Sequence, residues 1–177
     1  MLEKQLRMVR RSLDDLPELD IPNGYELRTY RPGDEAAWAE IMNAGIGEWT
    51  AEKCRESLTS QPQFFPDGLF FVTFEGKPVG SACAWRKSPD EWTSGCLHMV
   101  CVIPEHRGKQ LGYLLTLAVL HYFRAQGFRE VWLDTDDWRI PAIKAYLRLE
   151  FEPYYLDDSH QARWRIVLGR AISSSMP

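Results

Sequence analysis

The sequence has no long apolar run and few of the residues that usually bind metals. None of its stretches approaches the ~20 apolar residues that a membrane helix needs, and the beginning, MLEKQLRMVRRSL, has no apolar signal-peptide core. We therefore expect a cytoplasmic protein with no membrane partner. The four histidines follow neither HxxxH nor HExxH spacing, so the sequence predicts no metal site.

Cysteine and unbalanced positive charge are also scarce. The four cysteines form no CxxC pair; they are Cys54, Cys83, Cys96 and Cys101. Their apolar surroundings indicate buried thiols in a reducing compartment. The formal net charge is −4, with no basic stripe and no run of lysines. The sequence therefore gives no reason to expect a nucleic-acid partner.

The hydrophobic and charged fractions of the sequence are those of one globular domain. Hydrophobic residues make up 45% and charged residues 26% of the 177 residues, and a chain of this length buries about 70% of its unfolded surface. We divide the chain into an N-terminal arm, residues 1–23, and a single domain, residues 24–177. The arm ends at the turn Pro22-Asn23-Gly24. The sequence of the arm is compatible with two conformations, an added strand of the sheet and a partly ordered tail.

Hydrophobic periodicity predicts an α+β fold. Strands are expected over residues 25–30, 69–74, 79–85, 97–103 and 131–134, with closing strands over 151–155 and 162–168 that pair with each other. Helices are expected after Asp34, from Thr50 to about Ser60, from Leu111 to Gly127 and over 138–149. Helices interleaved with hairpins favour a mixed sheet over a regular βαβ repeat.

One stretch changes from the period of a strand to that of a helix. Residues 97–103 are apolar and rich in β-branched side chains, and apolar residues recur at helical spacing from Leu111 onward. The loop between them, PEHRGKQLG, contains neither GxxxxGK[ST] nor GxGxxG. The first amides of a helix have no intrahelical partner, so a glycine-containing loop here is suited to bind phosphate. Arg107 and Lys109 add positive charge beside it.

This loop resembles the acyl-CoA pyrophosphate loop of the GNAT family of N-acetyltransferases, R/Q-x-x-G-x-G/A. The match is carried by Val102-x-Pro104 and by Arg107-x-x-Gln110-x-Gly112, with Gln110 where the first glycine is usual. The resemblance implies acetyl-CoA as co-substrate. The residues that it places at the cofactor are Val100, Val102, Arg107, Gly108, Lys109, Gln110, Leu111 and Gly112.

A second segment resembles the later GNAT motif N-x-x-A-x-x-x-Y-x-x-x-G-F. Its matching positions are Ala142, Tyr146 and Phe151. Glu150 replaces the glycine, which we interpret as a matter of backbone geometry. Arg139 replaces the asparagine that usually contacts pantetheine. Arg139 either reaches a cofactor phosphate or pairs with Asp136 or Asp137, and we keep it as a cofactor-binding candidate.

The resemblance covers roughly residues 24–168 and implies a GNAT-like, mostly antiparallel central sheet flanked by helices. Two central strands of that fold splay apart where the cofactor's amide chain binds. The implied function is direct transfer of an acetyl group from acetyl-CoA to a primary amine in a ternary complex. A non-catalytic acyl-CoA-binding or sensing module on the same fold is the alternative. A small-molecule amine is the expected partner; a protein N-terminus or lysine and a homodimer stay open.

The resemblance also suggests the residues that move protons. Tyr146 is the candidate proton donor to the departing thiolate. The two-residue period of a strand places His98 on the same face as Val100, and a strand histidine helps remove the amine proton in arylalkylamine N-acetyltransferases. Because an unperturbed imidazole titrates there, we expect an acidic limb in the kcat/KM profile at about pH 6 to 7. The alternatives are a water chain and the carboxylates Asp134, Asp136 and Glu91.

Aromatic residues surround the segments expected on the acceptor side. They are Trp49, Phe64, Phe65, Trp85 and Trp92. Aromatic side chains line many small-molecule sites, although most aromatics simply belong to the core. The sequence therefore hints at an apolar or aromatic amine as acceptor.

Overall fold

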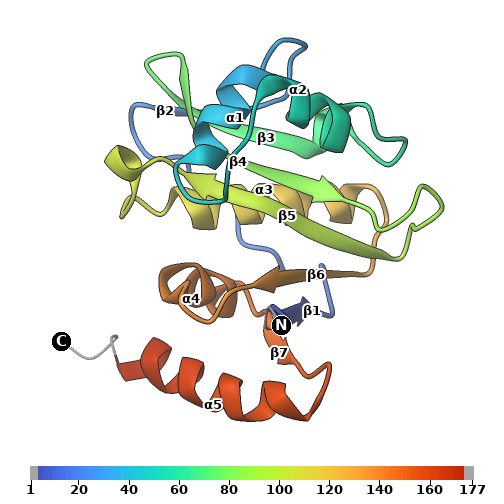
Figure 1. Ribbon diagram of the computed structural model, residues 1–177, viewed down its shortest axis with the longest axis vertical. Coiled ribbons are helices and arrows are strands. Elements are labelled where there is room, and N and C mark those ends of the chain that lie inside the picture. The colour runs from blue at the N-terminus through green and yellow to red at the C-terminus, as the bar shows by residue number, and fades with distance from the viewer. Residues whose placement is uncertain (1–3, 174–177) are drawn as a thin grey trace.

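The computed structural model describes residues 4–173, so the outer ends of the two predicted segments, residues 1–3 and 174–177, lie outside the described part. A seven-stranded sheet runs through the molecule in the order β2-β3-β4-β5-β6-β1-β7 (Figure 1). Its strands are β1 (Leu6–Arg10), β2 (Tyr25–Thr29), β3 (Leu69–Phe74), β4 (Lys77–Trp85), β5 (Ser94–Val102), β6 (Glu130–Thr135) and β7 (Glu152–Tyr154). Neighbouring strands are antiparallel except for β5 and β6. The predicted mixed, mostly antiparallel sheet is confirmed.

The helices cover the two faces of this sheet. They are α1 (Glu35–Asn43), α2 (Ala51–Cys54), α3 (Leu111–Ala125), α4 (Ile140–Arg148) and α5 (Asp158–Ser173). Helix α2 begins at Thr50, whose hydroxyl accepts a hydrogen bond from the Lys53 amide (3.2 Å), and continues as a π-helical turn, Arg55–Thr59. No helix among residues 4–173 is long and apolar enough to cross a bilayer.

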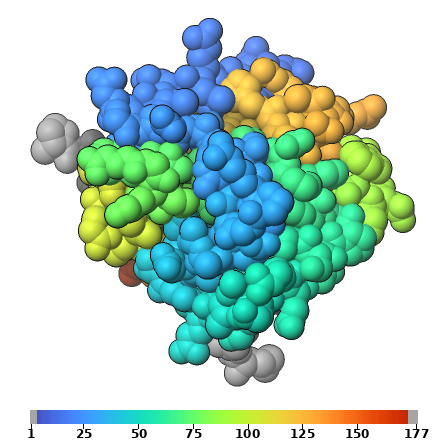
Figure 2. Space-filling view, turned by 90° about the horizontal axis from the view of Figure 1, so that it is seen from above, coloured from blue at the N-terminus to red at the C-terminus, as the bar shows by residue number. Residues whose placement is uncertain are grey.

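The buried residues form two cores, one on each side of the sheet. The α3-side core contains residues of α3, α4 and α5, including Leu115, Phe123 and Tyr146. The α1-side core contains residues of α1 and α2 and the inner side chains of β3 and β4. Seen from above, α1 and α2 cover one end of the molecule, and the loops around residues 105–110 and 86–93 lie on opposite sides (Figure 2).

The N-terminal segment is an inner strand. Strand β1 pairs with β6 and with β7, and its Leu6 and Met8 side chains are completely buried. Arg10 is also buried; its guanidinium donates to the Leu149 carbonyl and pairs with Glu150 (3.0 Å). Of the two arrangements that fit the arm from its sequence, the structure therefore shows the strand.

The prediction of a closing strand over residues 162–168 is wrong, because this segment belongs to α5. The buried residues His160, Trp164, Val167 and Ala171 recur at helical spacing. Asp157 accepts hydrogen bonds from the amide (3.0 Å) and hydroxyl of Ser159 at the start of the helix. Strand β7, which was expected to pair with residues 162–168, instead pairs with β1.

The central strands part as the GNAT resemblance predicted. The parallel pairing of β5 with β6 ends at Cys96 and Trp132. From Leu97 onward β5 has only β4 as a hydrogen-bonding neighbour, so one row of its backbone groups faces a gap in the sheet. An unsatisfied buried backbone group costs about 1–3 kcal/mol, so a gap of this kind favours a ligand that supplies donors and acceptors.

A β-bulge in β5 overturns the predicted facing of His98. Met99 has a φ of 54°, and it lies with Val100 opposite the single β4 residue Ala82. The extra residue reverses the alternation of side chains. As a result His98 stacks on Trp85 of the α1 side, with ring centroids 5.7 Å apart, whereas Val100 packs against the α3-side core.

Candidate active site

A cavity of about 430 Å³ opens where β5 and β6 separate. Its walls include His98 and Val100 of β5, Trp132 of β6, and Tyr146 of α4, with Arg139 at the start of that helix. The structure therefore brings together both candidate catalytic residues and two of the predicted cofactor contacts. The loop of residues 104–112 lies outside this cavity, beyond the end of β5.

Tyr146 is held in the wall of the cavity by helix α4. Its side chain is 7% exposed, and its ring packs edge-on against Phe151 at 5.9 Å between centroids. Burial raises the pKa of Tyr146 to about 12, while the positive charge of Arg139 lowers it. The hydroxyl is therefore protonated at neutral pH and can donate a hydrogen bond to a sulfur that gains negative charge.

His98 faces the cavity from the α1 side. Burial lowers its pKa to about 4, and the nearby Asp134 carboxylate opposes that shift. The imidazole is therefore neutral at pH 7, with one ring nitrogen able to accept a proton. The ring is buried against Trp85, which sequence alone could not show, and this burial moves the expected acidic limb of activity from about pH 6.5 to lower pH.

The three carboxylates that rival His98 as a base are all engaged in other contacts. Asp134 forms two hydrogen bonds with Arg7 (2.8 and 2.9 Å), and Asp136 pairs with Arg139 (2.9 Å). Glu91 does not line the cavity; it accepts hydrogen bonds from the following residues of its own loop, which lower its pKa. Of these four candidate bases, His98 is the one that lines the cavity without an ion-pair partner among residues 4–173.

The loop before α3 presents unpaired backbone amides. The first backbone bond of the helix runs from the Leu114 amide to the Gln110 carbonyl (3.0 Å), so the amides of Leu111, Gly112 and Tyr113 precede the helical ladder. A Cβ added at Gly112 would meet no atom within 4 Å. The Leu111 side chain is buried, which leaves its amide as the group that can reach a ligand. Free amides beside this open space at Gly112 fit a phosphate group.

The two residues that replace motif glycines have the left-handed backbone conformation that glycine adopts easily. Gln110 and Glu150 both have a φ of 58°, in the left-handed region that costs most residues about 1–2 kcal/mol. Both side chains also contact an arginine: Gln110 accepts a hydrogen bond from Arg148 (2.9 Å), and Glu150 forms an ion pair with Arg10 (3.0 Å). The loop conformation that suits a phosphate therefore does not depend on glycine at position 110.

Two other predicted phosphate contacts have side chains occupied elsewhere. The Arg107 guanidinium donates to the carbonyls of Val102 and Ala44, both at 2.9 Å. The exposed Lys109 ammonium lies 5.8 Å from the ring centre of Tyr25, and Gly108, with a φ of 77°, bends the chain between them. Arg107 thus joins the loop to β5 and to the end of α1.

Arg139 makes the ion pair that the sequence left open as an alternative. Its Nε lies 2.9 Å from Asp136, and its Nη2 donates to the Gly45 carbonyl (3.1 Å). The guanidinium also lies over the ring of Trp138, 4.3 Å from its centre. The side chain that replaces the family asparagine therefore points across the cavity to the loop after α1.

The aromatic residues singled out from the sequence are dispersed. Trp85 lines the cavity, whereas Phe65 and Trp92 both lie against Arg86, and Trp49 packs on Trp38. Phe64 packs on Tyr30. Trp132, which the sequence analysis did not single out, lines the cavity opposite β5. The strand sequence EVWLDT could have indicated this, because Trp132 and Asp134 are two residues apart and therefore lie on the same face of the strand.

Thr135 is a second cavity residue that sequence reasoning missed. Its side chain is 3% exposed, and its Oγ1 has no hydrogen-bond partner among residues 4–173. Buried hydroxyls nearly always have a partner. The hydroxyl at the end of β6, in the wall of the cavity, is therefore free to form a hydrogen bond with a ligand or with an ordered water.

Thr135→Val should separate folding stability from ligand binding. Valine matches the shape of threonine and removes the unsatisfied hydroxyl, so we expect the melting temperature of the free protein to rise by a few degrees, in line with about 1 kcal/mol. The additional rise on adding acetyl-CoA should become smaller. Thermal denaturation with and without acetyl-CoA measures both effects. An unchanged response to acetyl-CoA would show that the hydroxyl does not contact the donor.

The four cysteines do not provide a nucleophile. All are buried, and burial raises the pKa of each thiol; they are Cys54, Cys83, Cys96 and Cys101. A thiol with a raised pKa is not the thiolate that attacks an acyl group. Among residues 4–173 no group of three His, Cys, Asp or Glu side chains is arranged to hold a metal ion.

Parted central strands above a cavity, followed by a helix with free N-terminal amides, define the class of acyl-CoA-dependent acetyltransferases. The model of the GNAT acetyltransferase family matches residues 38–151, and the chain belongs to this family. It is 36% identical over 167 residues to a mycothiol acetyltransferase of Thermomonospora curvata, covering 89% of this chain and 54% of that protein. A mycothiol acetyltransferase of Nocardia farcinica is 33% identical over 171 residues, covering 90% and 56%. The chain spans about half the length of these relatives.

Solved structures show the same fold. A GCN5-related N-acetyltransferase from Sphaerobacter thermophilus superposes with a TM-score of 0.70 at 23% identity, covering 86% of this chain and 50% of that one. The similarity includes the mixed sheet and its flanking helices. At this level of identity it supports the architecture and leaves the acceptor to be argued from the site.

Proposed function

We propose that the chain transfers an acetyl group from acetyl-CoA to a primary amine, directly and within a ternary complex. The observation that carries the proposal is the cavity at the parted strands, where a buried, protonated Tyr146 and a neutral His98 enter from opposite sides of the sheet. Family membership and relatives named as acetyltransferases support the same reaction.

The donor is expected on the α3 side of the sheet. The amides of Leu111 and Gly112 offer hydrogen bonds to its pyrophosphate, and the exposed backbone edge of β5 between Val100 and Val102 offers them to its amide chain. The unpaired Thr135 hydroxyl and the open space at Gly112 fit such a ligand. A thioester that enters along this edge ends beside Tyr146.

The reaction needs a neutral amine and a departing thiolate. The amine nitrogen attacks the thioester carbonyl, a C–N bond forms, and the C–S bond breaks. His98 accepts the proton that the amine loses, and Tyr146 donates a hydrogen bond or its proton to the sulfur. The products are an acetamide and free CoA thiol, so protons balance between the two side chains and solvent.

The acceptor enters from the α1 side, between Trp85 and Trp132. These walls suit a small-molecule amine with apolar or aromatic parts. The relatives' name points to a small molecule of the mycothiol type for those proteins. A protein N-terminus or lysine is the competing acceptor class. We place the reaction in the cytoplasm, where acetyl-CoA and reduced thiols coexist.

Amine-dependent release of CoA thiol tests the proposal. The purified chain is incubated with acetyl-CoA and defined pools of small amines, and acetylated products are identified by mass spectrometry. Product formation that requires both substrates supports acetyl transfer. Calorimetric binding of acetyl-CoA without turnover in any pool would favour the non-catalytic acyl-CoA-binding module. The absence of both binding and turnover would contradict the two functions together.

His98→Gln should remove an acidic limb that lies near pH 4. The folded pKa of His98 is below the ordinary value of about 6.5, so its neutral, proton-accepting form persists until the pH falls to about 4. Protonation of the amine substrate lowers kcat/KM of both proteins equally, so we expect the ratio of wild-type to variant kcat/KM to stay level from pH 7 to 5 and to fall near pH 4. The glutamine variant should be slower at pH 7 by about 100-fold, typical of a lost general base.

The pH profile of kcat/KM for both proteins, at saturating acetyl-CoA, measures this effect. Full activity of the variant at pH 7 would assign the base to Asp134, Asp136 or a water chain. The same buried histidine also affects folding. Because its pKa is lowered in the folded state, the unfolded chain binds more protons between pH 6.5 and 4, so the stability that neutral His98 gives is lost as the pH falls through this window.

A further inference from the structure

Two arginines from different parts of the chain hold the α1–α2 loop, residues 44–50. Arg107, from the loop before α3, donates to the Ala44 carbonyl (2.9 Å), and Arg139, from the start of α4, donates to the Gly45 carbonyl (3.1 Å). These carbonyls follow the C-terminal end of α1, where the helix dipole favours positive charge. The next residue, Ile46, lines the cavity.

The α1–α2 loop lies on the acceptor side of the cavity. Ile46 and Trp49 pack against the α1-side core, together with Trp85 and Met99. His98 stacks on Trp85 of the same side. Tyr146 and Val100, expected at the donor, belong to the opposite core. A movement of this loop would therefore change the space available to the amine before it changed the donor site.

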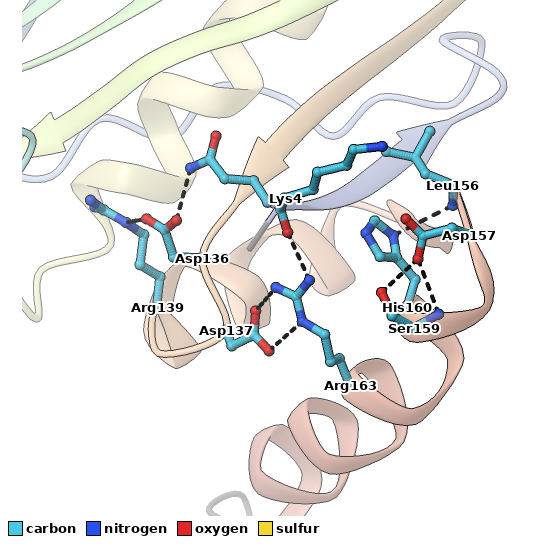
Figure 3. Close-up of polar contacts among 10 residues, drawn as sticks. Lys4, Asp136, Asp137, Arg139, Leu156, Asp157, Ser159, His160 and Arg163 are labelled. Carbon is cyan, nitrogen blue, oxygen red and sulfur yellow. Dashed lines mark hydrogen bonds and ion pairs between the residues drawn. The ribbon is translucent and has the colours of Figure 1, made fainter. Parts of the chain in front are cut away.

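Arg139 is itself fixed by contacts at the β6–α4 turn (Figure 3). One oxygen of Asp136 accepts from Arg139 Nε (2.9 Å), and the other accepts from the Gln5 amide group (2.9 Å). The ring of Trp138 lies against the guanidinium. With Nε and one face engaged, the Nη2 group keeps one direction, toward Gly45. A bidentate, planar side chain can make both contacts at once, which a lysine ammonium cannot reproduce.

The same turn is braced from the other side by α5. Asp137 accepts from Arg163 Nε (3.0 Å) and Nη2, and Arg163 Nη1 donates to the Lys4 carbonyl (2.7 Å). Figure 3 shows the neighbouring carboxylates pointing to different arginines, Asp136 to Arg139 and Asp137 to Arg163. The turn that carries Arg139 is therefore tied to α5 and to the residues just before β1.

From these contacts we infer that Arg139 is a positioning residue that holds the α1–α2 loop over the acceptor side of the cavity. It sets the affinity for the amine and leaves the affinity for acetyl-CoA unchanged. This inference rests on the proposed acetyl transfer, because it assigns the α1 side to the acceptor. It gives a role other than donor binding to the side chain that replaces the family asparagine.

The test compares Arg139→Lys and Arg139→Asn with the wild type. Lysine keeps a charge beside Asp136 and loses the contact to Gly45; asparagine restores the family residue and also loses that contact. We expect the KM for the amine to rise about tenfold in both variants, the change that about 1.4 kcal/mol produces, while the KM for acetyl-CoA stays the same. Hydrogen exchange of the amides of residues 44–50 should become faster in both variants, without any substrate present.

Arg11→Gln is the matched control, because it removes an exposed arginine–carboxylate pair, Arg11 with Glu152 (2.7 Å), and Arg11 lines a neighbouring pocket and not the cavity itself. It should change neither KM nor exchange of residues 44–50. Equal increases of both KM values in the Arg139 variants would overturn the inference and assign Arg139 to the donor. Unchanged exchange of residues 44–50 would overturn it as well. If the wild type transfers no acetyl group, the proposed function fails, while the exchange experiment still decides whether Arg139 holds the loop.

Discussion

Tyr146→Phe is expected to lower kcat by about 100-fold, the lower end of what a general acid contributes, and to leave the dissociation constant of acetyl-CoA unchanged. The substitution removes only the hydroxyl, so the ring keeps its contact with Phe151. Because burial raises the Tyr146 pKa to about 12, the wild-type hydroxyl is a donor throughout the range of activity, and the thiolate loses this donor in the variant.

Release of CoA thiol gives kcat, and calorimetry gives the affinity for acetyl-CoA. Tyr122→Phe is a matched control: Tyr122 lies on α3, its pKa is also raised to about 12 by burial, and it packs against Phe65 and Phe70 outside the cavity. That variant should keep full turnover. If Tyr146→Phe also keeps full turnover, water alone protonates the departing thiolate.

Gly112→Glu should abolish binding of CoA. The open space at Gly112 accommodates the new side chain, and its carboxylate would lie at the N-terminus of α3, where it competes with the pyrophosphate for the free amides. The wild type should gain about 2.7 kcal/mol of stability at a CoA concentration 100 times its dissociation constant. The variant should show no gain at the same concentration.

Thermal denaturation with and without CoA measures this difference. The free variant should remain as stable as the wild type, because a negative side chain is favourable in the first turn of a helix. Gly169→Glu is the control: Gly169 lies in α5 and also has open space around it, so that variant should respond to CoA like the wild type. A normal response of Gly112→Glu would show that the pyrophosphate binds elsewhere.

Local patterns were sufficient to predict the loop before α3 and the helix that carries Tyr146. Neighbouring residues are enough to determine where a strand ends at a proline and where a helix with a clear apolar period forms. The left-handed conformation of Glu150 agrees with the interpretation of its motif position as a backbone effect. Thr50 likewise begins α2 through a bond to an amide three residues away. Such features need no knowledge of the distant chain.

The features that escaped prediction depend on distant partners. The bulge at Met99 depends on β4, where the single residue Ala82 lies opposite Met99 and Val100. The sequence of β5 alone shows only a mostly apolar run and gives no sign of the bulge. The segment 162–168 alternates like a strand, and it is helical because Trp164 and Val167 fill the α3-side core. The lowered pKa of His98 and the unpaired hydroxyl of Thr135 likewise follow from burial in a cavity made by several elements.

The place of β1 in the sheet has a consequence for how the chain reaches this structure during synthesis. Strands β2 to β5 neighbour one another in sequence order, so they can pair as they leave the ribosome. Strand β1 is made first, but its partners are β6 and β7, with Leu6 opposite Thr135. Pairing over such a separation is slow, and until it occurs the strand leaves its backbone groups and its apolar side chains Leu6 and Met8 uncovered. We expect β1 to be among the last strands placed, so the β6 wall of the cavity would be completed only when most of the chain has been made.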